Sequence, residues 1–143
     1  MAKYVDYLVG PGGKKPYKKY AGDAGWDLFV SRPVDIEPGE TVDIHTDIYI
    51  SMPPKTYARI TGRSSTLRKL GLLVYEGIID NGYTGEMFVC VHNLSPHTVH
   101  IEPGMRLAQM IFGTIEDIRW SEVDEIKQDP RKRGSAGFGS TGR

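Results

Sequence analysis

The segment Gly77-Ile78-Ile79-Asp80-Asn81-Gly82-Tyr83-Thr84-Gly85 places one carboxylate and one aromatic ring on a tight turn between two apolar runs. Asn-Gly between such runs is a strong hairpin signal, because both turn positions favour φ > 0. We therefore expect Asp80 at the mouth of a β-hairpin and not in a core. An acid fixed there could orient a water molecule, and Tyr83 could form the floor of a pocket. An Asx-type turn with a surface tyrosine is the simpler alternative.

Short strand-like runs lie on both sides of this hairpin and are separated by turns that contain proline or glycine. Apolar and polar side chains alternate over residues 42–50, which is the period of a half-buried strand. The pattern predicts an all-β fold, a distorted jelly roll or β-sandwich. The expected strands are Asp27–Val30, Val42–Ser51, Thr56–Thr61, Gly71–Val74, Glu86–His92, Thr98–Ile101 and Leu107–Phe112.

One short helix is expected over Ser64–Leu70, with Ser64 or Ser65 as its cap and Gly71 at its end. At 143 residues the chain is predicted to form one domain. We place this domain at residues 1–130, because the composition then changes to Arg and Lys and afterwards to Gly and Ser. Residues 131–143 are predicted to form a flexible C-terminal arm.

The composition excludes several classes of function. The chain has 18 basic and 18 acidic residues, whereas duplex DNA requires a broad positive face, so we expect no nucleic-acid partner. No run is long enough to span a membrane, and the N-terminus has no apolar signal segment. We therefore expect no membrane association and a cytoplasmic protein, or a nuclear one in a eukaryotic or viral setting. The single cysteine, Cys90, excludes an internal disulfide, and His97 and His100 lack further ligands for zinc.

Two segments before the hairpin carry side chains suited to an anion or a metal. Asp27 follows Ala24-Gly25-Trp26 at the start of a strand, where an acid is usually structural unless it faces other charge. Arg63, Ser64 and Ser65 combine a guanidinium group and two hydroxyls with the amides of a helix N-terminus. Such amides favour phosphate, although an ordinary helix with a basic surface is the alternative.

Two segments after the hairpin could also contact a nucleotide. Gln109 is polar in an otherwise apolar strand, and its amide must find partners in a neighbouring loop or in a ligand. In the arm, Phe138 stands among glycines between Arg133 and a Ser-Thr pair. A mobile segment of this composition could close over a nucleotide, with its ring on the base and its amides and hydroxyls on phosphates.

In this order and spacing, the five segments resemble the motifs of the trimeric dUTPases. Those motifs are A-G-x-D-L, a P/G-R-S-G block, G-[VIL]-I-D-x-x-Y-x-G, G-x-R-[IL]-A-Q and R-G-x-G-G-F-G-S-T-G. The resemblance runs from Ala24 to the end of the chain. It implies a jelly-roll-like fold and a homotrimer with three active sites, each built from two subunits and closed by the arm of the third. It also implies hydrolysis of dUTP to dUMP and pyrophosphate with Mg²⁺.

The resemblance implies a role for each matching residue. Asp80 would orient and activate the water that attacks the α-phosphorus, and Tyr83 would pack under the deoxyribose and exclude a 2′-hydroxyl. Asp27 would contact the metal through water. The hairpin backbone would read uracil, Phe138 would cover the uracil ring, and the rest of the arm would hold the β- and γ-phosphates. The implied substrate-binding residues are Arg63, Ser64, Ser65, Gly77, Ile78, Ile79, Tyr83, Phe88, Gln109, Arg133, Phe138, Gly139, Ser140 and Thr141.

The chain departs from these motifs at Ser65-Thr66, Val74 and Ala136. The first departure resembles the related dCTP deaminases, so a dCTP deaminase or a bifunctional deaminase and dUTPase is an alternative. Alignment of the hairpins puts Cys90 where that reaction needs a glutamate, so we expect dUTP hydrolysis without deamination. A second alternative is a regulatory binding protein that engages a protein partner and is switched by nucleotide.

Overall fold

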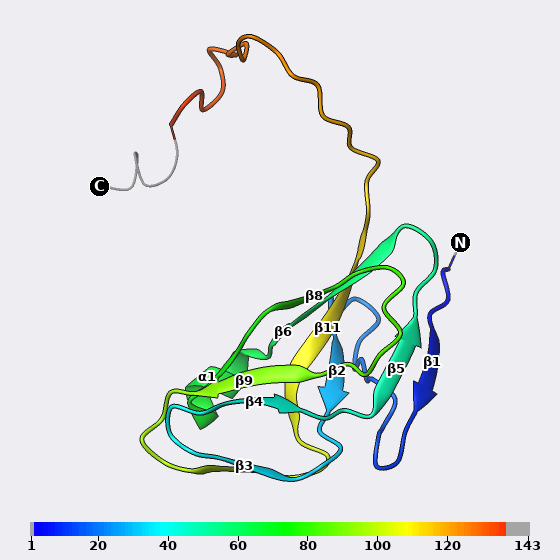
Figure 1. Ribbon diagram of the computed structural model, residues 1–143, viewed down its shortest axis with the longest axis vertical. Helices are drawn as coiled ribbons and strands as arrows, with labels where there is room; N and C mark the ends of the chain where they lie inside the picture. The colour runs from blue at the N-terminus through cyan, green and yellow to red at the C-terminus, as the bar shows by residue number, and fades with distance from the viewer. Residues whose placement is uncertain (1, 137–143) are drawn as a thin grey trace.

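The computed structural model describes residues 2–136. Within that range it contains eleven strands and one helix, arranged as in Figure 1. The elements are β1 (Asp6–Val9), β2 (Trp26–Phe29), β3 (Val34–Ile36), β4 (Thr41–Ile44), β5 (Ile48–Ser51), β6 (Thr56–Gly62), α1 (Ser64–Leu70), β7 (Leu72–Val74), β8 (Gly77–Ile79), β9 (Val89–Asn93), β10 (Val99–Ile101) and β11 (Arg106–Thr114).

The strands form two main antiparallel sheets and two smaller pairs. The larger sheet has the order β2-β11-β6-β8 and the second has the order β4-β9-β7, while β1 pairs with β5 and β3 with β10. One core joins the two main sheets, because Leu28 and Met110 of the first and Ile44 and Val91 of the second are all fully buried in the same cluster. The prediction of an all-β, jelly-roll-like sandwich is confirmed.

Strand β6 lies between β11 and β8 and sets the positions that matter for the site. Its side chains alternate in burial, with Ala58 and Ile60 in the core and Arg59 exposed. β11 pairs with its whole length, from Gly62 opposite Ala108 to Thr56 opposite Thr114. β8 pairs only with the middle of β6, from Ile60 opposite Gly77 to Ala58 opposite Ile79, so Asp80, which follows β8, lies toward the start of β6. The two ends of β6 therefore lead to two different groups of predicted site residues.

The predicted strand Val42–Ser51 is wrong in one respect, because it is divided into β4 and β5. The break lies at Asp47, which has a left-handed backbone conformation with φ of 52°. The Asp47 carboxylate accepts hydrogen bonds from the hydroxyl of Ser31 and from Arg32, whose Nε and Nη2 lie 3.1 and 2.9 Å away. These bonds hold the break open, and they come from residues that lie well before it in the chain.

The helix α1 has the predicted bounds, and Gly71 ends it with φ of 68°. The predicted cap is wrong, because Arg63 is the N-cap residue and no side chain caps the helix. Instead, the buried Thr66 hydroxyl donates to the carbonyl of Leu107 at 2.6 Å, which ties the helix to β11. The first-turn amides are thus left without a side-chain partner.

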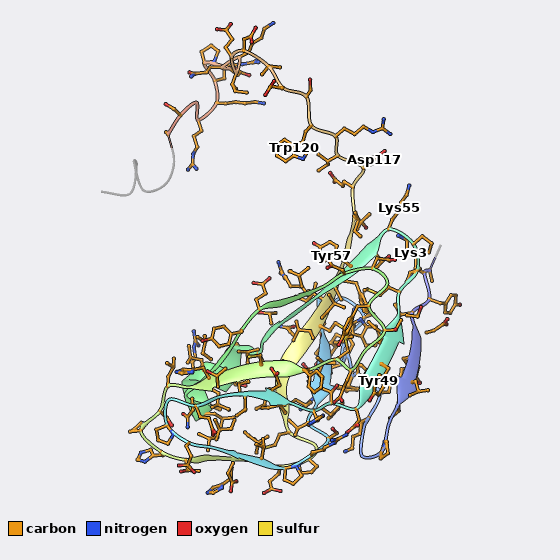
Figure 2. All side chains as sticks on the ribbon, in the orientation of Figure 1. Lys3, Tyr49, Lys55, Tyr57, Asp117 and Trp120 are labelled. Atoms are coloured by element: carbon orange, nitrogen blue, oxygen red, sulfur yellow. The ribbon has the colours of Figure 1, made fainter. Side chains whose placement is uncertain are left out.

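After β11 the chain leaves the sheets and extends away from them (Figure 1). No strand or helix is found between residues 115 and 136. Trp120 lies on this segment, clear of the body, and is 98% exposed (Figure 2). Ile118, Val123 and Ile126 are exposed as well. Exposed apolar side chains gathered on one segment are typical of an interaction surface.

In the described part of the chain, residues 2–136, we find no helix with the length and apolar character needed to cross a membrane.

Candidate active site

The larger sheet brings three charged residues together at one end of β6. Asp27 comes from β2, Arg106 from the start of β11 and Arg63 from the turn into α1. One oxygen of Asp27 lies 3.2 Å from Nε of Arg63, and the other lies 3.2 Å from Nη1 of Arg106. A second bond, from Arg63 to the carbonyl of Arg106 at 3.0 Å, completes the cluster. Two guanidinium groups therefore face a single carboxylate.

Gln109 lies beside this cluster and closes its floor. Its Nε2 is 3.4 Å from the carbonyl of Gly62, which precedes Arg63. Its side-chain oxygen packs so closely on Gly25 that a Cβ there would come within 2.2 Å of it. Gly25 must therefore remain a glycine for Gln109 to keep this position. The amide donates to the last residue of strand β6 and not to a neighbouring loop, which was one of the two sequence interpretations.

Asp27, Arg63, Arg106 and Gln109 line a cleft of about 550 Å³. Its rim is the basic segment Tyr17-Lys18-Lys19-Tyr20, and the ammonium group of Lys18 lies 4.7 Å from the centre of the Trp26 ring. Four basic and two acidic side chains line the cleft, so its field favours an anion with several charges. Ser64 and Ser65 follow Arg63 directly, at the uncapped start of α1.

The turn at Asp80 lies at the other end of β6. The amide of Tyr83 donates to the carbonyl of Asp80 at 3.1 Å, and Gly82 has φ of 99°. The side chain of Asn81 donates to the carbonyls of Pro53 and Thr56, both at 2.8 Å. Only Gly82 has a positive φ here, so the expectation that both Asn81 and Gly82 adopt one is wrong. The Asn81 side chain fixes the turn to the body instead.

The two runs beside this turn do not pair with each other as the hairpin prediction required. β8 is hydrogen-bonded to β6, whereas β9 begins only at Val89 and pairs with β4 and β7. The segment before β9 is hydrogen-bonded to β5, since the amide of Met87 donates to the carbonyl of Ile48 at 2.8 Å. Gly77, Ile78 and Ile79 thus form the edge of the larger sheet, and one row of their backbone groups faces away from β6.

The ring of Tyr83 lies across the backbone of the next turn. Its hydroxyl donates to the carbonyl of Glu86 at 2.9 Å, and a Cβ on Gly85 would lie 2.5 Å from the hydroxyl oxygen. The ring is therefore held at both its face and its tip, yet 42% of the residue stays exposed. Phe88 is exposed to a similar degree and meets the His45 ring edge-on, with centroids 5.1 Å apart.

Asp80 and Arg63 lie far apart within one chain, whereas Gly77 at the start of β8 lies opposite Ile60 in the middle part of β6. Six residue steps along β6 separate the position beside Asp80 from Arg63, which is about 20 Å at roughly 3.3 Å a step. Residues 115–136, which include Arg133, contain no strand or helix, and the chain after β11 extends away from the sheets (Figure 1). Phe138, Gly139, Ser140 and Thr141 lie outside the described residues. One chain therefore presents two half-sites.

Sequence reasoning missed two residues that the structure puts at these half-sites. Arg106 shares Asp27 with Arg63, and the signal was its place three residues before Gln109 on the same strand. Glu86 accepts the Tyr83 hydroxyl through its carbonyl, and its carboxylate is 8% exposed. Nothing in the local sequence distinguishes Glu86 from a solvated surface acid, because its partners lie about 40 residues away.

Two further observations define what the site is not. Among residues 2–136 no group of three or more His, Cys, Asp or Glu side chains could hold a metal ion alone. A second hollow, of about 520 Å³, is lined mainly by apolar residues of the N-terminal segment, β6 and β11, and contains none of the predicted site residues. The chemistry therefore concentrates at the two ends of β6.

Comparison with known proteins shows which family the chain belongs to. The chain matches the dUTPase family over residues 13–142. It is 41% identical over 130 residues to the deoxyuridine 5′-triphosphate nucleotidohydrolase of Corynebacterium diphtheriae, which covers 89% of this chain and 84% of that protein. Two solved structures are also similar. The dUTPase of Staphylococcus bacteriophage 80alpha with dUpNHpp aligns with a TM-score of 0.89 at 25% identity, over 99% of this chain and 100% of that one.

The second solved structure is a dUTPase from phage phi11 of S. aureus, described as showing the coordination of a structural Mg(II) ion. It shares the fold, with a TM-score of 0.81 at 24% identity, over 87% of this chain and 99% of that one. The matched family and the named relatives are nucleotide hydrolases, and that is the class of this protein. Within that class, the chain belongs to the dUTPase family. The resemblance seen in the sequence is confirmed.

Proposed function

We propose that this hydrolase of the dUTPase family converts dUTP to dUMP and pyrophosphate, with Asp80 orienting the water that attacks the α-phosphorus. Family membership supports the reaction, and the state of Asp80 supports its role. The residue is exposed on an anchored turn, and its carboxylate has no ion pair among residues 2–136. A carboxylate that is fixed but unpaired can accept a hydrogen bond from a water and draw a proton from it.

The edge strand β8 and the Tyr83 ring are proposed to read the nucleoside. Backbone groups of Gly77, Ile78 and Ile79 that face away from β6 can hydrogen-bond a base edge, and with Phe88 they enclose it. The ring of Tyr83 would lie under the deoxyribose and leave no space for a 2′-hydroxyl. The close contact of this ring with Gly85 and Glu86 supports that role, because a sugar-excluding surface has to be rigid.

The cleft at the other end of β6 is proposed to hold the triphosphate. Arg63, Ser64, Ser65 and Gln109 would contact phosphate oxygens, and the surplus of basic groups supports binding of a tail with several negative charges. We propose that Arg133, Phe138, Gly139, Ser140 and Thr141 close the site as part of a flexible arm, residues 131–143, that follows the domain of residues 1–130. Closure would exclude water and strengthen the charge interactions.

Magnesium is proposed as the cofactor. The chain fits a metal bound mainly by substrate phosphates, since Mg²⁺ keeps several waters and needs few protein ligands. Asp27 fits a contact through water, because both of its oxygens already face guanidinium groups. The ion would neutralise charge on the phosphates in the transition state. Asp27, Arg63 and Arg106 keep the cleft in shape for that complex.

A homotrimer with shared sites is proposed as the active form. Asp80 and Arg63 lie at opposite ends of β6, so one dUTP cannot be held by both from a single chain. The apolar side chains exposed on residues 115–126 support assembly, because they need a partner surface. Cytoplasmic location and a regulatory protein partner stay predictions.

Deamination of dCTP is not favoured. Cys90 lies on β9 opposite Asp43, in the place where the deaminases need a glutamate. Burial raises the pKa of the Cys90 thiol, which keeps it protonated at neutral pH. A neutral thiol cannot shuttle protons as a carboxylate does.

The test of the proposed function is product analysis with Mg²⁺ present and dUTP, dCTP, dTTP and UTP supplied separately. Only dUTP is expected to give its monophosphate and pyrophosphate. Conversion of dCTP to a uracil nucleotide would establish the deaminase alternative instead. No turnover of any nucleotide, with dUpNHpp still bound, would favour the regulatory binding protein.

A further inference from the structure

Glu86 occupies a position that none of the roles above explains. It lies between Tyr83 and Phe88, the two aromatic residues proposed to face the nucleoside, and its side chain is 8% exposed. Its carboxylate does not point to the site. One oxygen, Oε2, accepts hydrogen bonds from the backbone amides of Thr46 and Asp47, both at 3.2 Å, and lies 2.9 Å from Nδ1 of His45. A buried acid that gathers three partners on one oxygen is an anchor.

The partners of Glu86 exist only because the chain breaks between β4 and β5. The positive φ of Asp47 turns two successive amides inward instead of along a strand ladder. Ser31 and Arg32 hold Asp47 in that conformation. The socket for Glu86 is therefore built by the body of the protein and does not depend on the substrate turn.

The same residue binds the substrate turn through its backbone. The Glu86 carbonyl accepts the Tyr83 hydroxyl at 2.9 Å, and Glu86 forms an isolated β-bridge with Tyr49 of β5. Tyr49, labelled in Figure 2, marks that place on β5. The His45 ring, held by the Glu86 carboxylate, meets Phe88 edge-on. Both aromatic residues are thus positioned by one side chain and its neighbours.

We infer that Glu86 is the positioning residue for sugar selectivity: by docking into the break at Thr46 and Asp47, it holds Tyr83 where a ribose 2′-hydroxyl would collide. The inference rests on the proposed function, in which Tyr83 lies under the deoxyribose. Without the Glu86 carboxylate, the segment from Tyr83 to Phe88 can move outward. The Tyr83 ring then no longer occupies the space that a ribose 2′-hydroxyl needs. Discrimination between dUTP and UTP then falls, whereas phosphate binding in the cleft is unaffected.

The test compares kcat/KM for dUTP and for UTP in wild type, Glu86→Ala and Glu86→Gln. Glu86→Ala is expected to lower the dUTP-to-UTP ratio by about 10-fold or more, since one lost contact at a selective pocket costs that order. Glu86→Gln keeps an oxygen for the two amides and is expected to retain most of the ratio. The control is Asn93→Ala, which removes a buried side chain of β9 that donates to the carbonyls of Ile36 and His97. It is expected to lower the melting temperature and leave the ratio unchanged.

An unchanged ratio in folded Glu86→Ala would overturn the inference, as would an equal fall in Asn93→Ala. If Glu86→Ala does not fold, Tyr83→Phe removes the bond to the Glu86 carbonyl and keeps the ring. That variant is expected to lower the ratio in the same direction, and an unchanged ratio overturns the inference there too. Wild type that does not hydrolyse dUTP would overturn the proposed function itself, which is a separate and visible result.

Discussion

Two aspartates on the same sheet show opposite environments. Asp27 on β2 is one-fifth exposed, and each of its oxygens lies 3.2 Å from a guanidinium nitrogen. Asp80 follows the edge strand β8, is exposed and has no ion pair among residues 2–136. The paired acid keeps two arginines in place. The unpaired acid leaves its oxygens open to a water, which is the difference that the proposed roles of the two aspartates use.

The two half-sites also differ in how they are held. Charged side chains bind one another in the cleft, whereas the Asp80 turn is fixed by bonds from Asn81 to backbone carbonyls and from the Tyr83 amide to Asp80. Removing a charge from the cleft therefore changes its shape and its field together. Removing the charge of Asp80 is expected to leave its turn intact, because no hydrogen bond or ion pair within residues 2–136 uses that carboxylate.

The substitution Asp80→Asn is the strongest test of the difference between Asp27 and Asp80. We expect turnover of dUTP to fall by about 1,000-fold, the range for loss of a general base, with dUpNHpp binding and melting temperature unchanged. Steady-state kinetics and calorimetry measure these quantities. Asp6→Asn, an equally exposed acid on β1, is the control and should keep full activity. Near-normal turnover in Asp80→Asn would remove the distinction between the two acids.

A second test asks whether the C-terminal arm is needed for turnover at the two half-sites. Deletion of residues 131–143 is expected to lower dUTP turnover by about 100-fold or more, because an open site loses its closed geometry. The assembly is expected to persist, since the exposed apolar residues of 115–126 remain. Light scattering and kinetics on the same sample decide this. Wild-type turnover by the truncated protein would contradict the role of the arm.

A third substitution removes one of the two ion pairs of Asp27. Arg106→Gln leaves Asp27 with Arg63 only and is expected to raise KM for dUTP by about 10-fold, with a smaller change in kcat. The matched control is Arg59→Gln, which removes an exposed arginine paired with Glu76 on the same sheet. A kcat loss as large as that of Asp80→Asn would mean that the cleft acts in the chemical step.

The smallest effect on activity, and a separate effect on stability, is expected at Asp47. Hydrogen bonds from Arg32 and Ser31 hold the pKa of Asp47 below its ordinary value. A carboxyl with a lowered pKa in the folded state stabilises the protein at neutral pH, and this contribution is lost as pH falls below about 4 and through the folded pKa. Asp47→Asn should therefore be less stable at pH 7 and show a flatter dependence in that acid range.

Urea unfolding at several pH values measures this difference. Equal slopes for wild type and Asp47→Asn between pH 5 and the acid limit would show that Asp47 does not link stability to pH. Activity at neutral pH should change little, because the asparagine side chain also tolerates a positive φ. If Asp47→Asn also lost much of its discrimination between dUTP and UTP, then the bonds from Ser31 and Arg32 to Asp47 would be needed to position Glu86.

Much of this fold follows from local signals in the sequence. The alternation of apolar and polar side chains over residues 42–50 and the glycine at residue 71 are visible in the sequence, so the sandwich and the helix bounds were predictable. β1 was not, since all four of its residues are exposed and show no alternation. The break at Asp47 was hidden as well, because Ser31 and Arg32 that hold it lie far away in sequence.

The candidate site was predictable only in part. The motifs identify Asp27, Arg63 and Gln109, and the structure brings them together with Arg106. The distance from this cleft to Asp80 depends on how β6 pairs with β8 and β11, which no local pattern reveals. The role of Glu86 is hidden for the same reason, since its partners meet it only after two distant segments dock.

The length of β6 carries a consequence for how this sequence can change over evolutionary time. Its seven residues separate the two half-sites, and it is hydrogen-bonded along its length to β11. One inserted residue would move a half-site by about 3.3 Å and turn every later side chain to the opposite face. Loops elsewhere can gain or lose residues freely. The length of β6 fixes the distance between Asp80 and Arg63, so relatives are expected to keep that length even where little of its sequence is shared.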